Sequence, residues 1–127
     1  MYHYVRNCDA HGYKLNSLDF NLFNQQIEYL SKNYHILSLD ELQDLMSSKT
    51  PINPKKPYVT LTFDDGFIDH YQNVFKILTK YNCKAIFFPI TENIGNNIVS
   101  DVHKIQLIIA KNKNIDFLLN EIISMID

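Results

Sequence analysis

The fold of this chain is decided by the stretch Tyr58-Val59-Thr60-Leu61-Thr62-Phe63-Asp64-Asp65-Gly66. Its first six residues favour a buried β-strand, and the strand is expected to end at the two aspartates. In parallel α/β proteins, loops at the C-terminal strand ends form the crevice that carries the chemistry. Adjacent carboxylates repel each other unless a cation or a shared proton relieves them. The pattern therefore predicts a site where one aspartate binds a metal and the other handles a proton.

An Asp-Gly pair is also typical of a two-residue hairpin turn, which requires an alternating strand directly after it. Here the apolar residues recur instead at helical spacing, at Val74, Ile77, Leu78 and Tyr81. The order strand, loop, helix is therefore predicted, and the functional interpretation of the aspartates is preferred to a turn.

Four short strands are predicted, alternating with helices, at residues 2–5, 34–37, 58–63 and 85–88. Ser17 is a candidate N-cap for the first helix. Ser38 and Glu41 have capping-box spacing for the second helix. The buried stripe of that second helix is expected to consist of Leu39, Leu42, Leu45 and Met46. A proline-punctuated connector follows at 51–57.

A third helix, from about Asp69 to Tyr81, connects the last two strands, so these strands are expected to pair in parallel. The apolar run at 85–88 does not alternate, as expected where helices cover both faces of a strand or where a barrel encloses it. Ser100 and Asn114 are candidate caps of two final helices. Four parallel strands can form a small open sheet but cannot close a barrel of about eight, so residues 1–98 are interpreted as the N-terminal part of a larger domain.

Bulk properties exclude several classes of protein. The 127 residues carry a formal net charge of −2 with a pI of about 6.2, which argues against binding nucleic acid or an anionic membrane surface. The sequence has no apolar run long enough to span a membrane and no secretory signal at its start. Cys8 and Cys83 form no disulfide framework. A cytoplasmic protein is predicted.

Thr62-Phe63-Asp64-Asp65-Gly66 resembles the first signature of the polysaccharide deacetylase family, the NodB-homology enzymes. Residues 83–88 resemble the strand that follows in that family, and 1–5 resemble the Tyr-His-x-Val first strand of a bacterial subgroup, as do 23–30 and 36–39. The resemblance covers roughly residues 1–110. It implies an α/β fold that forms the N-terminal portion of a distorted (β/α)7 barrel, with four or so parallel strands, ending in helices.

The resemblance also implies the chemistry. The family is composed of hydrolases that act on carbon–nitrogen bonds and remove acetyl groups from a sugar or polysaccharide precursor. Asp64 would be the general base that takes a proton from water. Asp65 would bind a divalent metal, usually zinc. His3, Gly66 and His70 are candidates to line the site, although His3 can equally be a plain strand residue and His70 a solvated residue at a helix start.

The family's His-x-x-x-His pair is absent, because Leu107 stands four residues after His103. The resemblance places a helical insertion here, so residues 99–127 are expected to be its beginning, cut short before the pair. One carboxylate cannot hold a catalytic zinc, which typically takes three protein ligands. This chain alone is therefore expected to be inactive. An inactive fragment or glycan-binding pseudoenzyme and a magnesium-dependent phosphoryl-transfer domain are the alternatives, and the oligomeric state is left open.

Overall fold

The computed structural model describes residues 1–7, 15–47, 55–96, 98–112 and 114–126. Cys8 and the first part of the predicted connector lie outside the described residues. The chain divides into two compact units. Residues 1–7 and 17–90 form the first, and residues 8–16 and 91–127 form the second.

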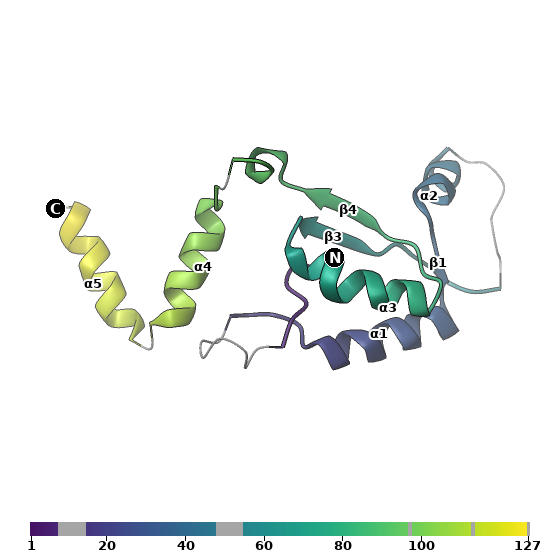
Figure 1. The fold of residues 1–127 in the computed structure, drawn as a ribbon, viewed down its shortest axis with the longest axis horizontal. Helices are drawn as coiled ribbons and strands as arrows, with labels where there is room; N and C mark the ends of the chain where they lie inside the picture. Colours follow the sequence, from purple (N-terminus) through teal and green to yellow (C-terminus); the bar gives the residue numbers. More distant parts are fainter. Residues whose placement is uncertain (8–14, 48–54, 97, 113, 127) are drawn as a thin grey trace. The chain divides into compact units, whose positions relative to one another are not determined.

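Within its described residues, the first unit contains two parallel sheets of two strands each (Figure 1). In one sheet, β1 (His35–Ile36) pairs with β2 (Tyr58–Val59). In the other, β3 (Thr62–Asp65) pairs with β4 (Ile86–Pro89). Parallel pairing across the helical crossover is thus confirmed.

The single strand predicted at 58–63 is wrong, because the ribbon changes partner within it. The N–H of Leu37 donates to the carbonyl of Val59, whereas the N–H of Ile86 donates to the carbonyl of Leu61. The chain therefore leaves one sheet and enters the other around Thr60, and β3 runs on to include both aspartates.

The predicted strand at 2–5 is present only as two isolated parallel bridges, Tyr2 with Phe63 and Val5 with Leu18. The second bridge also explains why Ser17 is not a helix cap. Leu18 is held extended beside the N-terminal segment, so α1 (Phe20–Asn33) begins later, and its N-cap is Asp19.

Helix α2 (Leu39–Met46) has the predicted capping box, in which Ser38 and Glu41 exchange side-chain and backbone hydrogen bonds. The predicted buried stripe is wrong, since none of its residues is buried and both Leu39 and Met46 are exposed. Two strands of two residues each offer too little surface to cover an apolar helix face.

The predicted third helix is helical from Ile68, is a π-helix over His70–Val74 and continues as α3 (Phe75–Lys80). The core of the first unit lies among α1, this helical segment, β3 and the N-terminal segment. Its buried members are Val5, Phe23, Ile27, Leu61, Phe63, Val74, Ile77 and Leu78.

The described residues do not cover both faces of β4 with helices, and the alternative, enclosure of this strand by a barrel, stays a prediction. Phe87 and Phe88 are 40% and 55% exposed. Within the described residues β4 pairs only with β3, so it is an edge strand.

The second unit contains a 3₁₀ turn (Thr91–Asn93), α4 (Asp101–Lys111) and α5 (Ile115–Ile126). Asn114 caps α5, since its Oδ1 accepts from the N–H of Phe117 at 3.1 Å. Ser100 precedes α4 but makes no capping bond, because its hydroxyl accepts from Asn93 instead.

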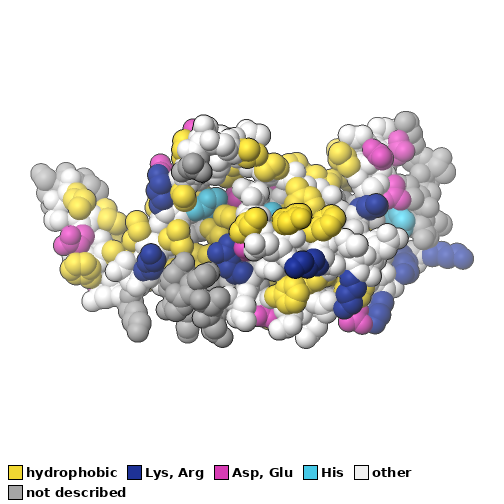
Figure 2. All heavy atoms as spheres, in the orientation of Figure 1, with side chains coloured by type: hydrophobic (Ala, Val, Ile, Leu, Met, Phe, Trp, Pro, Cys, Tyr) yellow, Lys and Arg dark blue, Asp and Glu magenta, His cyan; other side chains and the backbone are white. Residues whose placement is uncertain are grey.

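Hydrophobic side chains show on the surface of α4 and α5 (Figure 2). They include Val102, Ile105, Ile108, Ile109, Ile115, Phe117, Leu119, Ile122 and Ile123. In the part of the chain that the structure describes, no helix combines the length and apolarity needed to cross a membrane. The assignment of residues 99–127 to a helical insertion stays a prediction.

Candidate active site

The two aspartates are the last residues of β3, and both are half-buried. Asp64 lies opposite Phe88 and Asp65 opposite Pro89 in the parallel register. Successive residues of a strand point to opposite faces, so the two carboxylates can serve different partners. Among the described residues, no hydrogen bond or ion pair to the Asp64 carboxylate is found, which leaves that group able to accept a proton.

The backbone is strained where β3 ends. Asp65 has a φ of +74°, and Gly66 follows with a φ of +72°. The left-handed region costs an ordinary L-residue about 1–2 kcal/mol. Such outliers persist where the surrounding structure imposes them, and they cluster at active sites and ligand clamps. The strain at Asp65 therefore marks this strand end as a functional candidate independently of its sequence motif.

Gly66 is required by space as well as by conformation. A Cβ at this position would lie 2.8 Å from the Cβ of Pro89, the last residue of β4. The predicted role of Gly66 as a lining residue stays a prediction, but its absent side chain lets the turn pack closely on β4.

The structure brings His3 to Asp65, a residue 62 positions later in the chain. The Nδ1 of His3 lies 2.8 Å from the Oδ2 of Asp65. A ring N–H facing a carboxylate donates to it, which fixes the orientation of the imidazole. The sequence analysis named both His3 and Asp65 as candidates for one site, and in the structure their side chains are in direct contact.

His70 lies behind this pair and is not a solvated helix-start residue, because it is only 6% exposed. Its Nε2 lies 2.8 Å from the carbonyl oxygen of His3. The rings of Phe63, Phe67 and Phe87 surround the imidazole, with centroids 5.4–5.9 Å away.

Sequence reasoning missed an ion pair beside the site. The Nε of Arg6 lies 2.6 Å from the Oδ2 of Asp69, whose side chain is almost completely buried. The guanidinium also lies 4.8 Å from the centroid of the Tyr4 ring. Burial raises the pKa of the Tyr4 hydroxyl, while Arg6 acts in the opposite direction. An arginine directly after an apolar segment and an aspartate just past the motif were the only sequence signals for this pair.

The metal site implied by the family is not completed by these residues. The described part of the chain contains no group of three or more His, Cys, Asp or Glu side chains that could hold a metal ion. The metal-binding role of Asp65 therefore stays a prediction. His103 is buried in the second unit and supplies no such group.

Residues 52–117, slightly more than half of the chain, match the family model described as polysaccharide deacetylase. The chain belongs to the polysaccharide deacetylase family. It is 44% identical over 43 residues to the putative polysaccharide deacetylase YxkH of Bacillus subtilis, which is 34% of this chain and 15% of that protein. It is also 44% identical over 46 residues to a bifunctional xylanase/deacetylase of Pseudobutyrivibrio xylanivorans, which is 36% of this chain and 8% of that protein.

Solved structures with the same fold include the Streptococcus pyogenes deacetylase PplD in complex with acetate. Its TM-score is 0.64 at 30% identity, over 83% of this chain and 48% of that one. A de-N-acetylase from Aggregatibacter actinomycetemcomitans gives 0.63 at 26% identity, over 79% and 41%. IcaB from Ammonifex degensii gives 0.60 at 26% identity, over 74% and 38%.

These comparisons confirm the predicted family and the predicted α/β barrel fold. The chain spans less than half the length of each of these proteins.

Proposed function

We propose that this chain contributes to a carbohydrate deacetylase that hydrolyses N-acetyl groups on a sugar or polysaccharide precursor. The observation that carries the proposal is the end of β3. There the family motif ends in a strained Asp65 that contacts His3, next to Asp64, whose carboxylate has no described partner. The match to the family model includes this strand.

In the proposed reaction, the Asp64 carboxylate takes a proton from water as the water oxygen attacks the acetyl carbonyl carbon. The carbon–nitrogen bond then breaks, acetate leaves, and the amine nitrogen of the sugar takes up a proton. The contact between His3 and Asp65 holds a second carboxylate in a fixed orientation beside this centre.

We also propose that Asp65 is one ligand of a divalent metal, with zinc as the first candidate. The described residues supply too few ligands to complete such a site. The same observation favours a second candidate function, a glycan-binding protein without catalysis. The deacetylase family match favours either of these over magnesium-dependent phosphoryl transfer.

The test is to introduce Asp64→Asn into the chromosomal copy of the gene and to measure the acetyl content of the cell's glycans by mass spectrometry. This tests the protein in the form in which the cell makes it. The deacetylase proposal predicts that one glycan class gains acetyl groups in the Asp64→Asn strain. Glu121→Gln, an exposed carboxylate change in α5, is the matched control and should have no effect.

Unchanged acetylation in the Asp64→Asn strain would contradict the deacetylase proposal. If the purified variant still bound glycans of that strain, the non-catalytic alternative would be favoured.

A further inference from the structure

Two carbonyl groups of the N-terminal segment are satisfied by side chains rather than by a neighbouring strand. The Nε2 of His70 lies 2.8 Å from the carbonyl oxygen of His3, and the Nδ2 of Asn73 donates to the carbonyl oxygen of Val5, also at 2.8 Å. Alternate carbonyls of an extended segment point to the same edge. Residues three apart on a helix share a face, so the spacings of donors and acceptors match.

The donors stand on the π-helix over 70–74, which follows the loop after β3. π-Helical turns are rare, and those that occur are often found at functional sites. Here the π-helical turn carries both donors that reach the N-terminal segment.

The contact also sets the state of the His70 ring. A carbonyl oxygen only accepts, so the Nε2 of His70 must carry the hydrogen. The Nδ1 is buried and has no hydrogen-bond partner in the described structure. A buried polar atom without a partner lowers stability. The hydrogen bond from Nε2 to the His3 carbonyl is therefore the interaction that accounts for a histidine at this buried position.

The opposite edge of the same segment is held by β3. The N–H of Tyr2 donates to the carbonyl of Thr62 at 2.8 Å, and the N–H of Asp64 donates to the carbonyl of Tyr2 at 3.0 Å. The backbone at His3 is therefore fixed from both sides. The His3 side chain is 45% exposed and has little packing of its own, so its direction depends on how its backbone is held.

We propose that His70 is a positioning residue, assisted by Asn73, that holds the N-terminal segment so that the His3 imidazole meets Asp65. This inference rests on the proposed function, because the His3–Asp65 pair has a catalytic role only if the site is that of a deacetylase. Its structural content, the dependence of the His3–Asp65 contact on the Nε2–H of His70, can be tested without catalysis.

The experiment compares three variants of the full chain by NMR. His70→Gln keeps an N–H donor at a comparable reach, whereas His70→Phe keeps a ring and loses the donor. Ile77→Val removes one buried methyl group of the core and is the control for a general loss of stability. The first readout is the long-range ¹H–¹⁵N spectrum of the His3 imidazole, which reports the hydrogen bond at Nδ1.

The second readout is hydrogen exchange of the Asp64 amide, whose acceptor is on the N-terminal segment, with the Ile86 amide as the internal reference. In His70→Phe, the Nδ1 signal of His3 should move to that of an unpaired imidazole. The Asp64 amide should exchange about tenfold faster relative to Ile86, as expected for one lost hydrogen bond. His70→Gln should restore both, and Ile77→Val should change neither.

An unaltered His3 signal in His70→Phe, or an equal change in Ile77→Val, would overturn the proposal. Neither readout uses acetate release or glycan composition. Failure of the deacetylase proposal would therefore leave this result standing, and failure of this result would leave the deacetylase proposal untouched.

Discussion

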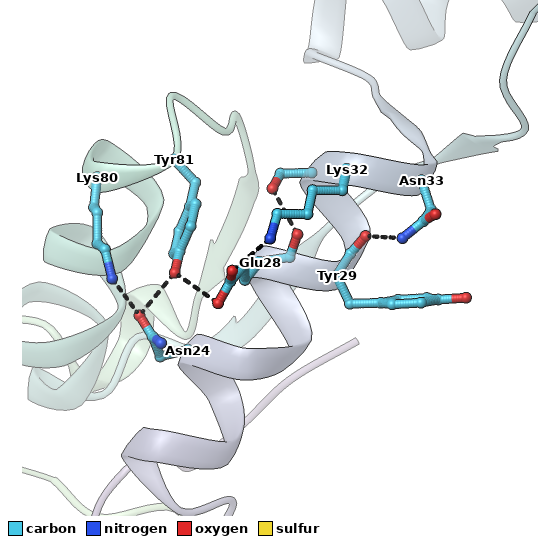
Figure 3. Close-up of polar contacts among 8 residues, drawn as sticks. Asn24, Glu28, Tyr29, Lys32, Asn33, Lys80 and Tyr81 are labelled. Carbon is cyan, nitrogen blue, oxygen red and sulfur yellow. Dashed lines mark hydrogen bonds and ion pairs between the residues drawn. The ribbon is translucent and has the colours of Figure 1, made fainter.

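Two polar networks join distant segments of the first unit, and they differ in kind. The first network joins the N-terminal segment to the end of β3 and the helix that follows. His3 contacts Asp65, Arg6 contacts Asp69, and the π-helix donates to two backbone carbonyls of the segment. These contacts are 2.6–2.8 Å long, and most of them are partly buried. Between α1 and α3, Asn24 accepts from Lys80 at 3.1 Å and from Tyr81 at 3.4 Å (Figure 3).

The second network has longer contacts between the helices, and only the two made by the Tyr81 hydroxyl are partly buried. Tyr81 also donates to Glu28 at 3.4 Å, and Glu28 pairs with Lys32 within the helix (Figure 3). The hydrogen bond from Lys32 lowers the pKa of Glu28. Exposed pairs of this kind contribute little, because water and salt compete with them. The short, partly buried contacts and the left-handed backbone of this unit therefore lie together, at the end of β3 where the sequence motif is found.

The largest effect is expected from Arg6→Met. It leaves the buried Asp69 carboxylate without its partner, and breaking a buried pair in this way costs about 3–5 kcal/mol. The free energy of unfolding, from urea denaturation followed by circular dichroism, measures it. The double variant Arg6→Met with Asp69→Asn should recover part of the loss. A decrease in the free energy of unfolding of less than about 1 kcal/mol, as for an exposed ion pair, would show that the two networks contribute equally to stability.

A somewhat smaller loss is expected from Gly66→Ala. The new Cβ meets Pro89 at 2.8 Å while the backbone stays left-handed, so we expect a cost of about 2–4 kcal/mol. Gly95→Ala is the matched control, since Gly95 is also left-handed but a Cβ placed there would have no neighbouring atom within 4 Å. It should cost only the conformational term, about 1–2 kcal/mol. Equal losses in thermal unfolding would show that the turn does not pack on β4.

A pH-dependent effect is expected at the capping box of α2. The backbone N–H of Ser38 donates to Glu41 and lowers the pKa of its carboxyl below the ordinary 4.5. This contribution is complete above pH 4.5 and is lost as the pH falls through the lower folded value. The protection of the Ser38 amide, measured as its exchange rate relative to the intrinsic rate at the same pH, should therefore fall on acidification below that value. In Glu41→Gln this acid-dependent step should disappear, and its persistence would assign the step to another group.

The smallest effect is expected from Tyr81→Phe. It removes the hydroxyl contacts to Asn24 and Glu28, both at 3.4 Å, and should change the free energy of unfolding by less than about 0.5 kcal/mol. The same urea denaturation measures it. A loss approaching that of Arg6→Met would mean that the α1–α3 network also holds the unit together.

The sequence predicted those features that depend on neighbouring residues. The strand, loop and helix around Asp64, the parallel crossover to β4 and the Ser38–Glu41 capping box all follow from local spacing. The change of partner near Thr60 did not, because a run of strand-forming residues carries no mark of which strand it pairs with.

The site was predicted in part for the same reason. The motif made Asp64 and Asp65 candidates, and the position of His3 at the end of the first predicted strand made it a candidate too. Contacts between residues more than 60 positions apart, such as Arg6 with Asp69, have no local pattern from which they can be inferred. The left-handed backbone of Asp65 is likewise imposed by the turn onto Gly66 and by the packing on β4, and the residue type alone does not predict it.

The central claim is that the end of β3 supplies the proton acceptor of a deacetylase. Its most direct test is acetate release from N-acetylglucosamine oligomers by the protein purified, through a chromosomal tag, from the cells that make it. We predict that Asp64→Asn abolishes acetate release while the free energy of unfolding stays within about 1 kcal/mol of the wild type. Undiminished acetate release by a folded Asp64→Asn protein would contradict it.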